Sequence, residues 1–148
     1  MSEPMTTLLE AWRSPTYDAY AEPVGGVYSE AAWLRRLGPS SWLIWGVLAR
    51  NLAATRGPVA VDLAEIAAGI GIGGPNPARP GSTLHRSLQR LRVNRLVRPA
   101  PHTGRRLLVR IYAPAVPWRA FHDLPDHVKR LHVATFQTIP AQPAGHAF

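Results

Sequence analysis

The side chains of this sequence that are best suited to chemistry are arginines, and they are concentrated in one stretch. Between Ile66 and His122 the chain has no aspartate or glutamate. The same stretch contains ten arginines: Arg79, Arg86, Arg90, Arg92, Arg95, Arg98, Arg105, Arg106, Arg110 and Arg119. Uncompensated positive charges repel each other, and a phosphate backbone relieves that repulsion. The stretch therefore favours a nucleic-acid partner over an ordinary solvated surface, although charge alone does not distinguish DNA from RNA, a ribosome or an anionic membrane.

Residue combinations that support catalysis or cofactor binding are weaker in this sequence. His122, His127 and His132 are spaced by five, which scatters them around a helix, and the chain has no cysteine to complete a metal site. Gly69–Gly74 fits the dinucleotide-binding pattern, but it follows a predicted helix instead of a strand and precedes Pro75. No acidic pair lies in an apolar setting, and no serine lies in a nucleophile elbow. We therefore expect no metal, no cofactor and no enzymatic activity.

The helix that carries the central arginines is predicted to begin after a cap at Gly81 or Ser82 and to end near Asn94. Its buried stripe consists of leucines at helical spacing: Leu84, Leu88 and Leu91, continued by Leu96. On a helical wheel the polar side chains lie opposite this stripe, so they form an outer face that is free to meet a partner.

The outer face of this helix carries groups that can recognise DNA. Arginine offers two donors to guanine, and glutamine can bridge adenine. The helix N-terminus adds backbone donors and a positive dipole, which suit a phosphate. The candidate DNA-binding residues of the helix are Ser82, Thr83, His85, Arg86, Gln89 and Arg90. The alternative is an ordinary exposed helix face without a partner.

A β-hairpin with a basic tip is predicted to follow this helix. Val97–Ala100 forms one strand and Leu107–Ala113 the other, whose alternating apolar residues indicate a half-buried strand. Pro101–Gly104 forms the turn between them. The residues at the tip that can reach neighbouring phosphates or the minor groove are His102, Arg105 and Arg106.

Four elements are predicted before the basic helix, and the first is a short helix over Ser29–Leu37 that ends at Gly38-Pro39. Apolar residues at helical spacing indicate a helix over Pro39–Thr55, and Val59–Val61 forms a short strand. Asp62 caps a third helix, and Glu65 three residues later completes a capping box. The apolar face of that helix consists of Leu63, Ile66, Ala67 and Ile70. The link from Gly69 to Gly81 is longer and richer in proline and glycine than a usual helix-turn-helix turn, and whether it contacts DNA is left open.

The two ends of the chain are predicted to extend a central domain of residues 29–116. Residues 1–28 mix acidic, aromatic and helix-breaking residues without a period, so we expect an arm that is extended or lies on the domain surface. Residues 117–148 are expected to form a short helical segment, a last helix and a disordered tail from Ile139. The stripe of the last helix either packs against the domain or forms a homodimer seam, and it consists of Leu124, Val128 and Leu131.

The order of these elements resembles the winged helix-turn-helix superfamily over Trp42 to Ala113, about half of the chain. The most characteristic residues are Val61-Asp62-Leu63-Ala64-Glu65-Ile66-Ala67, Ser82-Thr83-Leu84-His85-Arg86-Ser87-Leu88-Gln89-Arg90-Leu91 and Leu96-Val97-Arg98. The resemblance implies that an apolar helix packs under the basic helix, that the basic helix enters the major groove and that the hairpin forms a wing. The whole chain also resembles small, mostly uncharacterised winged-helix proteins of high-GC bacteria and their phages.

The sequence thus predicts a mainly α fold with a small β-hairpin, a winged helix-turn-helix with an N-terminal arm and a C-terminal helical extension. The expected function is sequence-specific binding of double-stranded DNA, as a transcriptional regulator or a phage- or plasmid-type control protein. Two alternatives remain, a winged-helix protein–protein interaction module in a larger complex and a replication or recombination accessory factor. The first residues hold no secretory signal, and no apolar stretch approaches the roughly 20 residues that span a bilayer, so we expect a cytoplasmic protein without a membrane partner.

Overall fold

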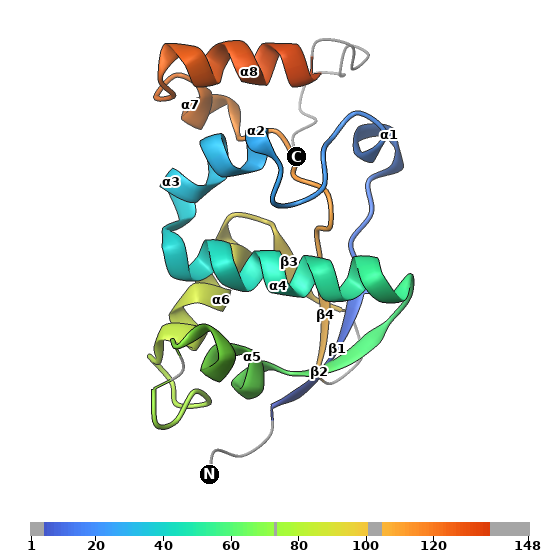
Figure 1. Cartoon of the computed structure of the whole chain (residues 1–148), viewed down its shortest axis with the longest axis vertical. Coiled ribbons are helices and arrows are strands. Elements are labelled where there is room, and N and C mark those ends of the chain that lie inside the picture. Colours follow the sequence, from blue (N-terminus) through green and yellow to red (C-terminus); the bar gives the residue numbers. More distant parts are fainter. Residues whose placement is uncertain (1–4, 73, 101–104, 137–148) are drawn as a thin grey trace.

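The computed structural model describes residues 5–72, 74–100 and 105–136, and it combines helices with one four-stranded sheet (Figure 1). In chain order the elements are β1 (Thr6–Ala11), α1 (Pro15–Asp18), α2 (Val27–Ser29), the π-helical η1 (Glu30–Leu34), α3 (Arg35–Leu37), α4 (Pro39–Thr55), β2 (Val59–Asp62), α5 (Leu63–Ile70), α6 (Thr83–Val93), β3 (Val97–Pro99), β4 (Arg106–Val109), α7 (Trp118–Phe121) and α8 (Asp126–Phe136). The bounds of α4, β2, α5 and α6 confirm the helices and the strand predicted there.

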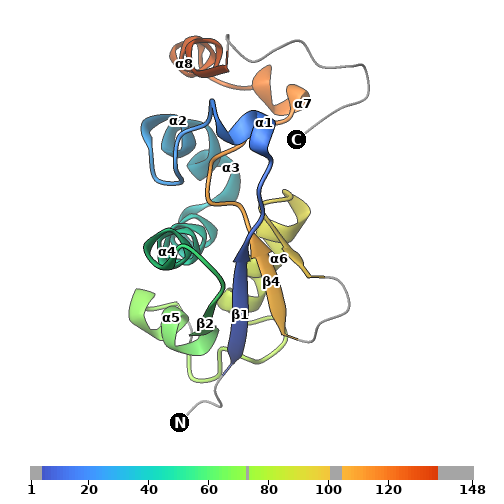
Figure 2. The ribbon, with the colours of Figure 1, turned by 90° about the vertical axis from the view of Figure 1, so that its right-hand side faces the viewer.

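The four strands pair in the order β2-β1-β4-β3 (Figure 2). β1 pairs antiparallel with β2 and parallel with β4, where Leu9 lies opposite Leu107. β3 and β4 form the predicted antiparallel hairpin, with Val97 opposite Val109. Helices with a small β component are therefore confirmed, but the sheet is larger than the hairpin alone.

The N-terminal segment differs most from its prediction as a surface arm. β1 has a paired strand on each side, and Leu9 is 0% exposed in the core. Alternate residues of a strand point to opposite faces, and the buried face of β1 is formed by Thr7 and Leu9. Because one of these two is a threonine, the apolar alternation of a half-buried strand is not visible in the sequence.

Two buried tryptophans attach the helices to the chain that follows β4. The indole Nε1 of Trp33 donates a hydrogen bond to the carbonyl oxygen of Pro114 at 2.8 Å, and that of Trp45 donates to the carbonyl oxygen of Arg110 at 2.9 Å. The two rings meet edge to face, with their centroids 6.0 Å apart. These contacts fix α4 across the sheet. In Figure 1, α5 and α6 lie below α4, and α2 and α3 lie above it.

Side-chain caps define where α5 and α6 begin. The Asp62 carboxylate accepts hydrogen bonds from the backbone N–H groups of Ala64 and Met5, each at 2.9 Å. These hydrogen bonds, that of Met5 above all, hold the pKa of the Asp62 carboxyl below its usual value. The Ser82 hydroxyl accepts from the backbone N–H of His85 at 3.0 Å. Both predicted N-caps are confirmed, but the Glu65 side chain forms no hydrogen bond back to Asp62, so the predicted capping box is only half formed. The Asp62 cap also joins the start of β1 to the end of β2.

The C-terminal helix α8 packs on α2 around a buried tyrosine (Figure 1). The Tyr28 hydroxyl accepts a hydrogen bond from the backbone N–H of Val116 at 3.0 Å, and its oxygen lies 2.8 Å from Nδ1 of His132. The tautomer of the imidazole decides which of the two groups donates in this second hydrogen bond. Burial lowers the pKa of His132 and raises that of Tyr28, so both groups stay uncharged at neutral pH.

This packing bears on the predicted homodimer seam of α8. Leu124 and Val128 are buried within the chain and belong to its core, and Leu131 is half-buried against the same core. Packing against the domain, one of the two alternatives for this stripe, thus occupies all three residues. A homodimer through them is not supported by the structure.

The apolar stripe of α6 is arranged differently from its prediction. Leu84 and Leu91 are fully buried, as predicted, but the buried residue between them is Ser87, while Leu88 is only half-buried.

We expect Leu84→Ala to lower the free energy of unfolding by about 2–5 kcal/mol, because it leaves a cavity in the core. Leu88→Ala should cost less than about 2 kcal/mol, because water already reaches this side chain. Urea unfolding of both variants measures the difference, and equal losses would contradict the assigned orientation of α6.

Candidate nucleic-acid interface

The predicted recognition face of α6 is accessible. His85, Arg86, Gln89 and Arg90 are all exposed, whereas Thr83 is half-buried. Ser82 is half-buried too, and its hydroxyl is engaged as the cap of the helix. The structure therefore separates the six predicted residues of this helix into four that face solvent and two that form its first turn.

A neighbouring arginine that the sequence analysis did not single out joins this face. A groove of about 480 Å³ brings Arg36 of α3 beside residues of α6, namely Arg86, Gln89, Arg90, Val93 and Asn94. The Arg36 Nε donates a hydrogen bond to the Asn94 side-chain oxygen at 2.7 Å, which holds the guanidinium along the groove. The contact spans 58 positions in the chain, so no local pattern indicates it.

Arg90 has a structural contact as well as an exposed position. Its Nη1 donates to the carbonyl oxygen of Leu37 at 2.9 Å, at the end of α3. The next residue, Gly38, has φ +81° and ψ 164°, a conformation that is essentially restricted to glycine. A Cβ at Gly38 would lie 3.3 Å from the same Nη1. Arg90 therefore links α6 to the junction between α3 and α4 in addition to facing the groove.

The hairpin contributes fewer free cations than predicted. Arg105 is exposed, but Arg106 forms an ion pair with Glu10 of β1. The Arg106 Nε is buried and has no hydrogen-bond partner among the described residues. His102 lies outside the described residues. Of the three predicted residues of the tip, Arg105 is the one that the structure shows exposed to solvent.

A second cleft, of about 480 Å³, lies between α6 and the hairpin. Its basic residues come from both elements and include Arg92, a residue that was not among the predicted contacts. Its apolar wall includes Leu63, Leu88 and Leu107. The lining is completed by Met5, Thr7, Ala78, His85, Gln89, Val97, Pro99, Arg105 and Arg106. The positive charge of α6 thus continues across this cleft onto the hairpin.

Two arginines of the basic stretch contact the Trp12 ring, and one of them, Arg110, is buried in the fold whereas Arg98 is exposed. The centroid of the Trp12 ring lies 4.4 Å from the guanidinium carbon of Arg98 and 3.9 Å from that of Arg110. Arg110 is 7% exposed and donates a hydrogen bond to the Ser14 hydroxyl. Burial lowers the pKa of Arg110, while Asp18 acts in the opposite direction. These cation–π contacts hold the chain after β1 against the end of β4.

The long link between α5 and α6 is held by its own hydrogen bonds. The Ser82 hydroxyl donates to the carbonyl oxygen of Pro77 at 2.7 Å, and the Ser82 backbone N–H donates to that of Arg79 at 3.0 Å. A groove of about 420 Å³ separates the link from α6 and has Arg79 and Arg86 in its walls. The link is thereby fixed to the N-terminus of α6, next to the predicted recognition face.

No known protein family, curated protein or solved structure matches this chain. In the part of the chain that the structure describes, no three histidine, aspartate or glutamate side chains lie close enough to hold a metal ion. No described helix has both the length and the apolar character needed to cross a membrane.

Proposed function

We propose that this chain is a winged helix-turn-helix protein that binds double-stranded DNA in a sequence-specific manner through α6. The elements α4, β2, α5, α6, β3 and β4 follow one another in the order of that superfamily. The sheet departs from this simple order, because β1 lies between β2 and β4. His85, Arg86, Gln89 and Arg90 of α6 are exposed in the presence of this additional strand.

The observation that carries the proposal is the exposed basic face of α6. Arg86 and Gln89 face solvent one helical turn apart, with Arg36 on one side and Arg92 and Arg105 on the other. A single helix fits the major groove of B-DNA, where arginine recognises guanine and glutamine recognises adenine. The flanking arginines are placed to contact phosphates on either side of that helix. A transcriptional regulator or a phage- or plasmid-type control protein uses such an interface.

The salt dependence of duplex binding tests this proposal. We expect the affinity for duplex DNA to fall steeply with salt, because each phosphate contact contributes about −0.9 to the slope of log affinity against log salt concentration. Arg105→Ala should make that slope shallower by about one unit and weaken specific and random duplexes equally. Arg119→Ala, on α7, removes the same charge from an exposed helix away from α6 and should leave the slope unchanged. Fluorescence anisotropy at several salt concentrations provides the measurement.

A second candidate function is favoured by exposed apolar side chains. Val93 on α6 is 70% exposed, and Trp118 on α7 is 71% exposed with its ring stacked on Phe121. Large exposed apolar side chains are typical of protein–protein contact surfaces. If the wild-type chain binds no duplex even at low salt, DNA binding is refuted and a protein-interaction module becomes the better explanation. A replication or recombination accessory factor would bind duplex without a preferred sequence.

A further inference from the structure

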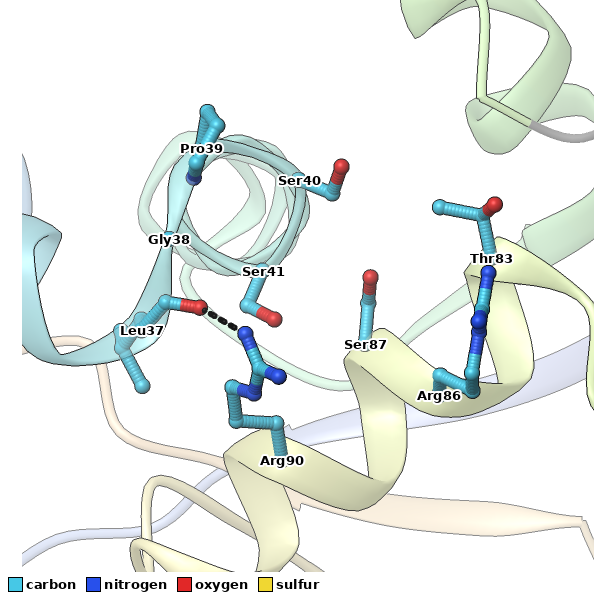
Figure 3. A pocket seen from close by; sticks show the side chains of 9 residues that line it. All are labelled: Leu37, Gly38, Pro39, Ser40, Ser41, Thr83, Arg86, Ser87 and Arg90. Atoms are coloured by element: carbon cyan, nitrogen blue, oxygen red, sulfur yellow. Dashed lines mark hydrogen bonds between the residues drawn. The ribbon is translucent and has the colours of Figure 1, made fainter.

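A pocket of about 220 Å³ lies between the N-terminus of α4 and one side of α6 (Figure 3). Residues 37–41 form one wall, at the junction of α3 and α4. The other wall is formed by α6, with Thr83, Arg86, Ser87 and Arg90. None of the lining residues is acidic, so the charge of the two arginines is not neutralised within the pocket.

Two serines that line this pocket are largely buried, and their hydroxyls have no partner among the described residues. Ser41 is 2% exposed and Ser87 is 5% exposed, and neither hydroxyl forms a hydrogen bond with a described residue. Both hydroxyl oxygens face the space between α4 and α6 (Figure 3). Two hydroxyls without a protein partner that open onto one small space can each donate a hydrogen bond to a ligand bound there.

The start of α4, which lines the same pocket, has backbone N–H groups without intrahelical partners. The first turn of a helix has N–H groups without intrahelical partners, and Pro39 at the first position has no N–H. The Trp42 N–H donates a hydrogen bond to the carbonyl oxygen of Gly38 at 3.1 Å. The N–H groups of Ser40 and Ser41 have no such backbone partner among the described residues. Gly38 has no side chain to cap them, and no side-chain cap is formed.

From these donors we infer that the pocket is a binding site for a phosphate group. The pocket supplies backbone N–H groups, hydroxyls and guanidinium groups around one space, and a tetrahedral oxyanion has enough acceptor oxygens for all three kinds. Arg90 is fixed at the rim by its hydrogen bond to Leu37, and its remaining guanidinium N–H groups are left to meet an anion. The positive end of the α4 dipole stabilises the same charge.

The phosphate has two chemical sources, a backbone phosphodiester of duplex DNA or a free phosphate. Arg86 and Arg90 belong both to this pocket and to the groove on the outer face of α6. A duplex lying along that face therefore passes the mouth of the pocket. The DNA source rests on the proposed function, whereas the free phosphate source does not.

Titration of the ¹⁵N-labelled full chain with inorganic phosphate and with dimethyl phosphate, at matched ionic strength in chloride, tests the site. We expect the amide signals of Ser40 and Ser41 to shift for at least one of the two probes. Ser87→Ala removes one neutral hydroxyl and should weaken binding of that probe about tenfold, because a hydrogen bond to a charged group is lost. Thr16→Ala, which removes an exposed hydroxyl on α1, should change nothing and is the matched control.

Duplex binding by the same variants separates the two sources. If Ser87→Ala weakens specific and random duplexes equally, by about tenfold, the ligand is a backbone phosphate. If it weakens only inorganic phosphate, the ligand is free phosphate. If the wild type binds phosphate here but no duplex at any salt concentration, the proposed function fails and this site stands. If neither probe shifts Ser40 and Ser41, and Ser87→Ala binds duplex like the wild type, the phosphate site is refuted.

Discussion

Arg86→Ala is expected to weaken binding to a preferred duplex by about 1–3 kcal/mol, a loss of roughly 5- to 150-fold. Arg86 is exposed at the start of α6, and no hydrogen bond or ion pair attaches its side chain to another described residue. Its guanidinium is therefore free to form two hydrogen bonds with a guanine. For the same reason the melting temperature should barely change, because nothing in the fold depends on this side chain.

Arg90→Ala provides an informative contrast to this variant. It removes the same charge from the same face, but it also leaves the carbonyl oxygen of Leu37 without its donor. We therefore expect Arg90→Ala to lower both affinity and stability, and Arg86→Ala to lower affinity alone.

Comparison of preferred and random duplexes assigns the role of Arg86. A loss confined to the preferred sequence indicates a base contact, and an equal loss on both indicates a phosphate contact. Wild-type affinity for both duplexes in an anisotropy titration would remove Arg86 from the interface and, with it, the recognition role of α6.

The elements that local patterns predicted well are those with local causes. α5 and α6 are each capped by a side chain that lies next to the helix, Asp62 and Ser82, and both caps are visible in the sequence. α4 is long enough for its buried stripe to repeat several times. The hairpin β3–β4 has only a short connection between its strands. Such features depend on residues a few positions apart, which is the range that a periodicity argument covers.

The features that local patterns missed depend on residues far apart in the chain. Glu10 forms an ion pair with Arg106, and the Trp12 ring forms cation–π contacts with Arg98 and Arg110. Three arginines of the basic stretch therefore interact with side chains of the N-terminal segment. A count of charges along the sequence included all three in the uncompensated basic stretch and placed Arg106 in the candidate site. In the structure, the candidate interface is smaller and includes arginines that the sequence analysis left out of the site, Arg36 and Arg92.

Buried hydroxyls are the other feature that polarity patterns misplace. Ser87 lies on the buried side of α6, in the place where the leucine spacing predicted Leu88. A serine is counted as an outer-face residue when a helical wheel is sorted by polarity. Ser87 is buried beside Ser41, and both line the pocket between α4 and α6. Their hydroxyls make this contact polar, whereas leucines there would make it apolar.

Leu9→Ala is expected to lower the free energy of unfolding by about 2–5 kcal/mol. Leu9 is fully buried in a strand that has a neighbour on both sides, so its truncation opens a cavity between the sheet and the helices. A leucine in a surface arm would contribute almost nothing to stability, which makes this variant a direct test of the fold. Leu8→Ala, on the adjacent half-buried position of the same strand, should cost distinctly less.

Urea unfolding followed by tryptophan fluorescence measures both variants, because Trp33 and Trp45 are buried in the same core as Leu9. A lower midpoint with an unchanged m-value indicates lost stability within the same folded state. If Leu9→Ala unfolds within about 0.5 kcal/mol of the wild type, a change typical of surface sites, β1 is not part of the core. If the loss is as large as expected, the chain before residue 29 is an integral part of the fold, since removal of β1 would leave β2 and β4 without their shared partner.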